Sequence, residues 1–293
     1  MSEAMSKVAR RDALSAIPFL IPYFVVFLVF RLYPIFWGFF LSLFDRDVLG
    51  MRNTFIGIQN YANLMSDSVF WTSLWNTFRY VAMSTPTIVP TALILALMLT
   101  KPTRLGGVYR VLFFLPRVLS VSVVSVVWVW ILQARYGLMN HFLRSFGLQG
   151  ISWLSDPAWA MRSIVLVDIW WVVGFQMIIF IAALTQIDRQ LYEAAWVDGA
   201  GSWRTFWQIT LPGIRPSLLF ILVTHVIGAF QIFGKVYIMT GGGPRGSTRV
   251  LVQYIYEAGF QFHRMGYASA LSYVLMLFIL IFTVIQFRVL RER

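Results

Sequence analysis

The sequence predicts an all-α membrane protein, a bundle of six transmembrane helices with a helix-turn-helix loop between the fourth helix and the fifth. Composition is the first reason: 59% of the 293 residues are hydrophobic and only 12% are charged, against about 45–50% and about 25% in soluble domains. The second reason is that the apolar residues form long uninterrupted runs, which is typical of chains that cross lipid. So few charged side chains would not cover the surface of a soluble fold of this length.

Six apolar stretches are long enough to cross about 30 Å of hydrocarbon as helices of about 20 residues. We place them at Ile17–Leu43, Leu74–Leu99, Tyr109–Leu132, Met161–Thr185, Ser217–Met239 and Tyr267–Phe287. Residues 1–16 are expected to form a cytoplasmic segment, and residues 17–293 one six-helix domain. Several spans contain prolines, such as Pro116 in the third, and a proline removes one backbone hydrogen bond and kinks a membrane helix.

The net charge of +12 is interpreted as a topology signal. The basic residues lie mostly at the ends of apolar runs, where they meet anionic lipid headgroups, so we expect membrane lipid and no nucleic acid as a partner. With the N-terminus inside, the cytoplasmic segments carry Lys and Arg at about twice the density of the external ones. The sequence therefore predicts a multi-pass protein of the cell (inner or cytoplasmic) membrane with both termini in the cytoplasm.

Several kinds of active site are excluded or disfavoured by the residues present. The chain has no cysteine, which excludes disulfides, thiolate metal sites and cysteine nucleophiles. Its three histidines, His141, His225 and His263, have no metal-ligand spacing with each other or with acids. It also lacks the phosphate-binding pattern G-x-x-x-x-G-K-[ST]. We expect no catalytic residue, no metal and no cofactor, and a separate polypeptide as the energy source.

Residues 186–216, between the fourth and fifth spans, read as two short helices joined at glycines. Asp188 can cap the first helix through its side-chain oxygen, and Gly199 and Gly201 can end it because glycine tolerates positive φ. The first helix presents a small apolar face made of Leu191, Ala194, Ala195 and Val197. Ser202 is expected to cap the second helix, Trp203 to about Thr210, which Pro212 and Pro216 would end.

This hairpin has two possible uses on the residues alone. Its alanines allow another surface to approach closely, and its aromatic side chains, Trp196, Phe206 and Trp207, could fill a pocket on a partner protein. It could also lie as an amphipathic helix on the lipid headgroups.

The order of residues in the hairpin resembles a known motif. Glu193-Ala194-Ala195, Asp198-Gly199-Ala200, Phe206, Ile209, Leu211-Pro212 and Pro216 are similar to the EAA loop of the permease subunits of binding-protein-dependent ABC importers. One departure is that Asp188 follows Ile187, where members of that family often have proline. The resemblance implies that this loop docks into a cleft of an ATPase subunit, through Glu193, Ala194, Ala195, Asp198, Gly199 and Ala200.

A second resemblance extends from about residue 55 to 286. Thr240-Gly241-Gly242-Gly243-Pro244 with Ser247-Thr248 is similar to a motif of the maltose- and glycerol-phosphate-type permeases, and further matches are Asn76-Thr77, Leu115-Pro116, Asn140 and Gly266-Ala268-Ala270. By itself the glycine run would indicate only a turn. The resemblance implies a second, non-identical permease in a heterodimeric pore, a dimer of ATP-binding subunits and an external solute-binding protein. It also implies a carbohydrate-class solute: a sugar, an oligosaccharide, a polyol or glycerol phosphate.

Charged residues inside the spans are costly and usually face a cavity or a partner. Arg31, Arg117 and Asp168 lie deep in their spans, and Asp168 could pair with either arginine. Arg79 and Lys235 lie near helix ends, where they are expected to extend toward the headgroups.

The fourth and fifth spans also hold polar and aromatic side chains that suit a sugar or polyol site. Candidates for the substrate pathway are Asp168, Trp171, Gln176, His225, Phe230, Gln231 and Tyr237, with Trp170 and Phe175 as further aromatic faces. Alternatively, such polar side chains bond neighbouring helices.

These features together predict the permease subunit of an ATP-driven ABC importer for a carbohydrate-class solute. The alternative is a secondary transporter driven by an ion gradient. That class usually has internal repeats and acidic or broken-helix ion sites, of which only Asp168 is a candidate here. A membrane-embedded enzyme would need a clustered set of acid, base or metal ligands, and none is visible.

Overall fold

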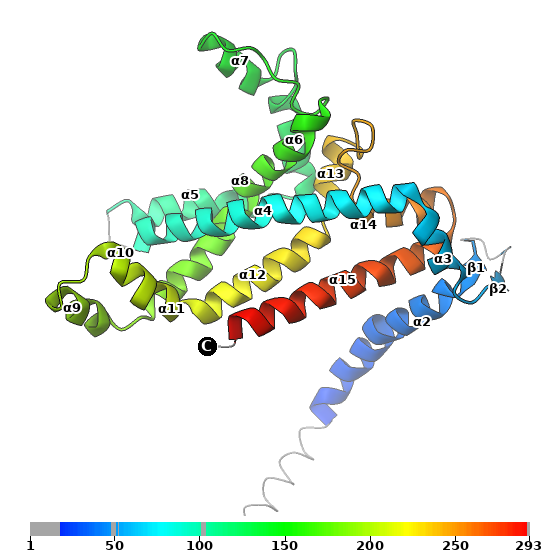
Figure 1. The fold of residues 1–293 in the computed structure, drawn as a ribbon, viewed down its shortest axis with the longest axis horizontal. Helices are drawn as coiled ribbons and strands as arrows, with labels where there is room; N and C mark the ends of the chain where they lie inside the picture. Colours follow the sequence, from blue (N-terminus) through cyan, green and yellow to red (C-terminus); the bar gives the residue numbers. More distant parts are fainter. Residues whose placement is uncertain (1–17, 48–50, 52, 101–103, 292–293) are drawn as a thin grey trace, which may run out of the picture. The chain divides into compact units, whose positions relative to one another are not determined.

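The structure is a computed structural model that describes residues 18–47, 51, 53–100 and 104–291 (Figure 1). Among these residues four helices are long and apolar enough to cross a membrane, and six spans result if each of two bent helix pairs counts as one. The expected cytoplasmic segment, residues 1–16, lies outside the described residues. The chain divides into two compact units, one made of the described residues up to Leu64 with Glu257–Tyr273, the other of the remainder.

The first unit contains the first span, Pro18–Ser42. This span includes a π-helical turn, Leu28–Leu32, followed by α2 (Tyr33–Ser42). Two short strands then form an antiparallel hairpin, β1 (Phe44–Arg46) and β2 (Asn53–Phe55), with Phe44 opposite Phe55. The prediction of helices alone missed this hairpin, which lies in the long polar and aromatic segment after the first span.

Close backbone packing holds the first unit together. The side-chain amide of Asn60, at the start of α3 (Gln59–Ser66), donates to the Ser42 and Phe44 carbonyls at 2.8 and 3.0 Å. A π-helical turn, Glu257–Gln261, precedes α15 (Met265–Arg291). At Gly266 a Cβ atom would lie 1.9 Å from the Phe44 carbonyl oxygen, so only glycine fits there.

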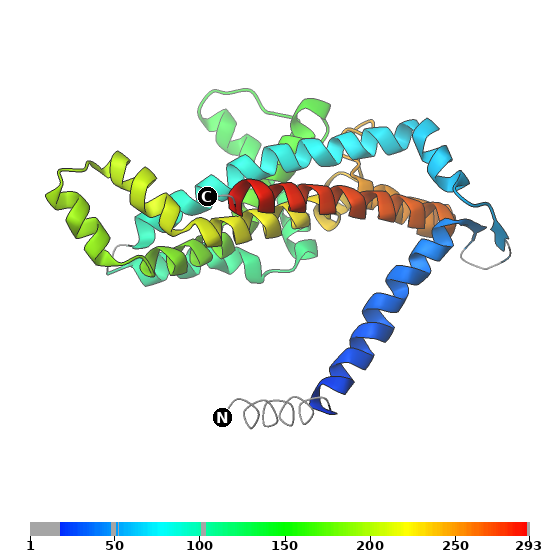
Figure 2. The ribbon, with the colours of Figure 1, turned by 60° about the horizontal axis from the view of Figure 1, so that its bottom comes forward.

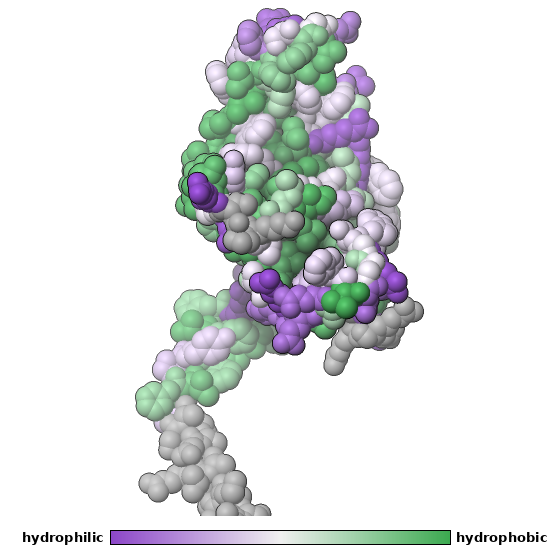
Figure 3. Space-filling model, turned by 90° about the vertical axis from the view of Figure 1, so that its left-hand side faces the viewer, coloured by the Kyte–Doolittle hydropathy of each residue, from purple (hydrophilic) through white to green (hydrophobic). Residues whose placement is uncertain are grey.

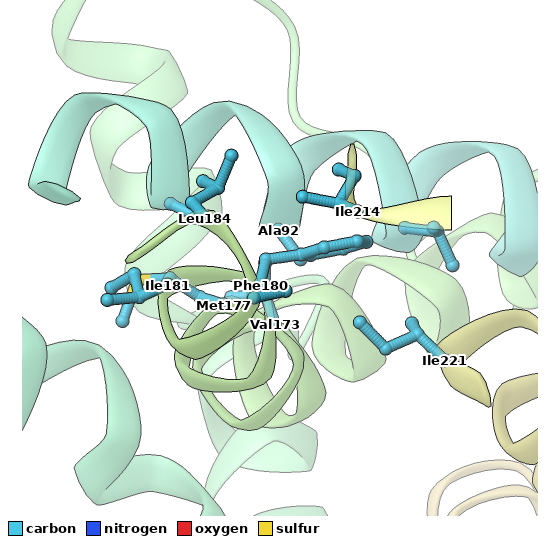
Figure 4. Close-up of a cluster of buried hydrophobic side chains, with 11 residues drawn as sticks. Ala92, Val173, Met177, Phe180, Ile181, Leu184, Ile214 and Ile221 are labelled. Carbon is cyan, nitrogen blue, oxygen red and sulfur yellow. The ribbon is translucent and has the colours of Figure 1, made fainter. Parts of the chain in front are cut away.

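The core of the second unit is formed by three helices, α4 (Ser68–Thr100), α8 (Pro157–Thr185) and α12 (Arg215–Phe230), with α5 (Gly106–Val118) packed along α8 (Figures 1 and 2). Its buried apolar cluster comes from α4, α8 and α12 and from the bend before α12 (Figure 4). Members labelled in that view are Ala92, Val173, Met177, Phe180, Ile181, Leu184, Ile214 and Ile221. Large areas of the remaining surface are apolar, as expected of helices that face lipid (Figure 3).

Two of the predicted spans are broken. Residues 109–132 form α5 and α6 (Val121–Ile131), which meet at an angle of 99°. Pro116 lies just before this break, and the Ser120 hydroxyl accepts from the Val123 amide to cap α6. The predicted fifth span likewise consists of α12 and α13 (Gly234–Met239), separated by residues 231–233. By contrast, α4 continues through Pro86 and Pro90.

The segment around α7 (Leu138–Ser145) is organised by Asn140, which is buried. Its amide nitrogen donates to the Ala134 and Ile151 carbonyls at 2.9 and 2.8 Å. Its amide oxygen accepts from the Ile151 amide and from the Trp153 indole at 3.0 and 2.9 Å. One side chain thus closes the segment between the third and fourth spans.

The glycine-rich loop is fixed to the start of α4. Asn76 donates to the Gly246 and Arg249 carbonyls at 2.8 and 3.0 Å, and the Thr77 hydroxyl accepts from the Leu251 amide at 2.9 Å, where α14 (Leu251–Tyr256) begins. Gly241 and Gly242 have φ of 59° and 85°, a region that favours glycine. The two sequence motifs, Asn76-Thr77 and the glycine run, are thus in direct contact in the structure.

Gly174 allows α8 and α5 to pack closely, and its substitution tests that packing. A Cβ atom there would lie 1.9 Å from the Phe113 carbonyl oxygen, so Gly174→Val should force the helices apart and cost roughly 1–3 kcal/mol. Thermal unfolding of the purified protein in detergent should show a lower Tm. Gly107→Ala on α5, where a Cβ would meet nothing within 4 Å, is the control and should leave the Tm unchanged or slightly raised. Equal Tm values for Gly174→Val and the unchanged protein would contradict this account.

Candidate functional site: a polar pocket and a helix hairpin

A pocket of about 410 Å³ lies in the second unit, where the middle of α8 faces the two helix breaks. Arg117 and Val121 flank the first break, and the segment 231–235 forms the second. Irregular backbone at membrane depth is tolerated where it is buried in protein or lines a cavity, which is the case for both breaks here. The volume lies in the range of small-molecule sites.

An ion pair occupies one wall of the pocket. The Lys235 ammonium donates to one carboxylate oxygen of Asp168, and the Tyr80 hydroxyl donates to the other. All three side chains are buried. The pairing of Asp168 with Arg31 or Arg117 is therefore wrong, and so is the expectation that Lys235 extends toward the headgroups. The cause is the break before α13, which brings Lys235 against α8.

Trp171 connects the two breaks. Its indole N–H donates to the Leu119 carbonyl at 3.2 Å, which satisfies a backbone group freed by the first break. Its ring lies 4.2 Å from the Arg117 guanidinium carbon and 4.4 Å from the Lys235 ammonium nitrogen, so both cations contact the same aromatic ring.

A second polar pair, Gln176 and His225, lies on α8 and α12. The Gln176 amide nitrogen and His225 Nδ1 are 3.0 Å apart, and both residues are buried. Gln176 Oε1 and His225 Nε2 have no hydrogen-bond partner among the residues that the structure describes. Both side chains line the pocket, and a buried polar atom without a partner calls for an explanation such as a bound polar group.

The structure brings most of the predicted substrate-pathway residues together. Asp168, Trp171, Gln176, His225 and Gln231 line the pocket, as does Phe175. Phe230 instead packs in the core against Phe78 and Phe282, and Tyr237 packs against Phe233 and Tyr256. Trp170 contacts Trp128.

Three pocket residues with ionisable side chains were not predicted as site residues: Tyr80, Arg117 and Lys235. The signal for Arg117 was present, because a cation that directly follows a proline inside an apolar run marks a place where a helix can break beside a polar cavity. Tyr80 gives no such signal, since an aromatic residue on a membrane helix most often only packs.

The hairpin between the fourth and fifth spans has the predicted first helix, α9 (Arg189–Val197), and Asp188 caps it by accepting from the Gln190 amide at 2.9 Å. Its end is a Schellman motif: the Gly199 and Ala200 amides donate to the Trp196 and Ala195 carbonyls at 3.1 and 2.9 Å. Gly199 has φ of 73°, as predicted, whereas Gly201 has φ of −69°.

The second helix of the hairpin differs from the prediction. Gly201, not Ser202, is its cap residue, and α10 (Ser202–Thr205), a π-helical turn (Phe206–Thr210) and α11 (Leu211–Gly213) follow one another. Pro212 does not end the helix at Thr210. The missing N–H of Pro212 is accommodated by the π-helical turn, and the chain bends by 69° before α12.

The first helix of the hairpin presents apolar side chains to its surroundings. Trp196 and Val197 are each 81% exposed, and Ala194 is exposed, whereas Ala195 is buried. Glu193 pairs with Arg189 at 2.9 Å on the surface. Gly199 and Asp198 are exposed, and Ala200 lines a cleft with Leu97, Tyr192 and Phe206, among others.

The hairpin and the glycine-rich loop contact opposite ends of α4. The hairpin cleft includes Leu97, and the loop bonds to Asn76 and Thr77. About 20 helical residues separate these positions, which corresponds to about 30 Å, the thickness of the hydrocarbon core.

Residues 74–292 match the family described as Binding-protein-dependent transport system inner membrane component, and the chain belongs to this family. The lactose transport system permease protein LacF of Rhizobium radiobacter is 39% identical over 281 residues, which cover 94% of this chain and 93% of that protein. A chain in the crystal structure of a bacterial ABC transporter involved in the import of the acidic polysaccharide alginate matches with a TM-score of 0.84 and 26% identity over 99% of both chains. A bacterial alginate ABC transporter in complex with its alginate pentasaccharide-bound periplasmic protein also matches with a TM-score of 0.84 and 26% identity, over 96% of this chain and 94% of that one.

The protein is thus an all-α inner membrane component and a transmembrane permease subunit of an ATP-driven ABC importer. Permeases of such importers assemble with another permease and with ATPase subunits. None of these matches supports the alternative of an ion-gradient-driven secondary transporter.

Breaking the buried ion pair tests the architecture of the pocket. Lys235→Met leaves the Asp168 carboxylate buried without its cation and should cost about 3–5 kcal/mol, whereas the double variant Asp168→Asn/Lys235→Met should recover most of that loss. Unfolding in detergent measures both. Arg189→Met removes an exposed ion pair and is the control, with little expected change. A double variant that is as unstable as Lys235→Met alone would contradict the assignment.

Proposed function

We propose that the pocket between α8 and the two helix breaks forms part of the path by which a carbohydrate-class solute, a sugar, oligosaccharide, polyol or glycerol phosphate, is imported. The single observation that carries this proposal is the Gln176–His225 pair, two hydrogen-bonded side chains that line the same pocket as the Phe175 ring and that each keep one buried polar atom without a partner among the described residues. Sugar sites combine such hydrogen-bonding groups with aromatic faces. The related proteins named as a lactose permease and an alginate importer support a saccharide as the imported solute.

The second part of the proposal concerns the hairpin. Its exposed apolar residues on α9, with Gly199 at the turn, suit insertion into a groove of an ATPase subunit. The residues assigned to this contact are Glu193, Ala194, Ala195, Asp198, Gly199 and Ala200. Closure of the ATPase dimer would then push on α9 and, through α8 and α12, on the walls of the pocket.

The assembly follows from the same proposal. A second, non-identical permease completes the pore, a dimer of ATP-binding subunits hydrolyses the nucleotide, and an external binding protein delivers the solute. The hairpin and both termini, including residues 1–16, face the cytoplasm, and residues 17–293 act as one permease domain. In this orientation the glycine-rich loop, at the opposite end of α4, faces outward. The higher density of basic residues in the cytoplasmic segments supports this orientation.

Uptake measurements test the role of the pocket. In proteoliposomes that contain the assembled importer, its binding protein and ATP, Phe175→Ala should reduce uptake of a radiolabelled solute from a panel of lactose, maltose and glycerol 3-phosphate by at least about tenfold, because an aromatic wall of the pocket is lost. Trp170→Ala is a matched control: Trp170 is 42% exposed and Phe175 45%, both on α8, but Trp170 lies off the pocket. Equal effects of the two substitutions would argue against the assigned path.

The coupling role is tested at the turn of the hairpin. Gly199→Val should abolish substrate-stimulated ATP hydrolysis, because a β-branched residue does not tolerate φ of 73°, while insertion and folding of the membrane helices stay intact.

Gly201→Ala is the control for this experiment. Gly201 has φ of −69° and a Cβ there would meet nothing within 4 Å, so stimulated hydrolysis should persist. Normal hydrolysis in Gly199→Val would refute the coupling role, and loss in both variants would show only that the hairpin tolerates no change.

A further inference from the structure

The charges of the pocket do not balance. Its only carboxylate among the described residues, Asp168, is already bonded to Lys235 and Tyr80. The other cation of the pocket, Arg117, has no carboxylate within 4.0 Å in the described part of the chain. One negative and two positive groups leave a formal charge of +1 on the pocket, carried by Arg117.

The guanidinium of Arg117 is held in place. It lies 4.2 Å from the centre of the Trp171 ring and 6.0 Å from that of Phe175. Trp171 is in turn fixed through its indole N–H to the Leu119 carbonyl. Such stacking leaves the edge of the guanidinium, with its N–H donors, available for hydrogen bonds. The group is therefore preorganised to receive a ligand at little entropic cost.

A planar guanidinium binds carboxylate, sulfonate and phosphate groups with paired, charge-assisted hydrogen bonds. Cations at membrane depth are costly unless they meet an anion or a water-filled cavity. Among the other polar side chains that line the pocket are Gln176 and His225, whose Oε1 and Nε2 have no partner among the described residues and suit the hydroxyl groups of a sugar. The pocket thus offers one anion-binding group and a separate pair of hydroxyl-binding groups.

We infer that the imported solute is an acidic saccharide, whose anionic group binds Arg117 and whose hydroxyls bind Gln176 and His225. This inference rests on the proposed function and narrows its substrate class from carbohydrates in general to those with a carboxylate, sulfonate or phosphate group. Arg117 is then a specificity-determining residue, while Lys235 serves to neutralise Asp168.

The test uses the assembled importer in lipid nanodiscs, without the soluble binding protein. Saturation-transfer NMR measures binding of glucuronate, glucose 6-phosphate and glucose, which share one ring but differ in charge. The two acidic probes should bind at least about tenfold more tightly than glucose, and increasing salt should weaken only them. Arg117→Gln should abolish this preference and leave glucose binding unchanged.

Two further variants make the result specific. Arg117→Lys keeps the positive charge but loses the paired hydrogen bonds of the guanidinium, so it should retain part of the preference for acidic probes. If the importer with Arg117→Gln fails to assemble, Arg117→Lys is the variant to compare with the unchanged protein. Arg79→Gln removes an arginine of α4 that lies outside this pocket and should change nothing.

The outcomes separate the two proposals. Equal binding of acidic and neutral probes, or a preference that survives Arg117→Gln, overturns the acidic saccharide but leaves the sugar pathway standing. Two results overturn both the acidic saccharide and the sugar pathway. One is that no probe gives a signal, and the other is that all probes give signals that Phe175→Ala does not reduce. Full displacement of glucuronate by inorganic phosphate, with glucose unable to compete, would show a simple anion site and also overturn the inference.

Discussion

A backbone that breaks inside a membrane must find partners for the N–H and C=O groups that the helix no longer pairs. This constraint shapes the second unit. At the first break the Leu119 carbonyl is satisfied by the Trp171 indole, and Ser120 caps the helix that follows. At the second break Lys235 turns toward Asp168. The pocket lies where two helices stop at the same place along α8, and two of its lining residues, Trp171 and Asp168, bond to residues at the first and the second break.

The continuous helix α8 connects this pocket with the hairpin. Its middle carries Asp168, Trp171 and Gln176, and its second half enters the apolar cluster through Met177, Phe180 and Leu184. Ile214, at the bend between the hairpin and α12, is fully buried in the same cluster (Figure 4). The hairpin is therefore joined to the pocket by packed side chains as well as by loops, and the coupling proposed above would act through this packing.

Sequence reasoning succeeded where local chemistry decides the structure. Apolar length located the spans, and Asp188 and Gly199 located the ends of α9, because caps and positive φ depend on single residues. It failed where distant contacts decide. The breaks after Val118 and Phe230 leave the apolar pattern unchanged, and Gly174 looks like any small residue until α5 is placed against it. The partner of Asp168 was mistaken for the same reason: hydropathy gives the depth of Lys235 but not the helix that it faces.

The hydrogen bonds of Asn140 have a consequence for its deamidation. Its amide makes two donor and two acceptor contacts, so hydrolysis to aspartate would replace both donations, to Ala134 and Ile151, by repulsion between oxygens. Deamidation begins with attack of the following backbone nitrogen on the side-chain carbonyl, which needs a mobile backbone. Here the His141 amide donates to the carbonyl of Gly137, the cap residue of α7, and both the nitrogen and the oxygen of the Asn140 amide are bonded. The hydrogen bonds that hold Asn140 in place therefore also oppose its deamidation.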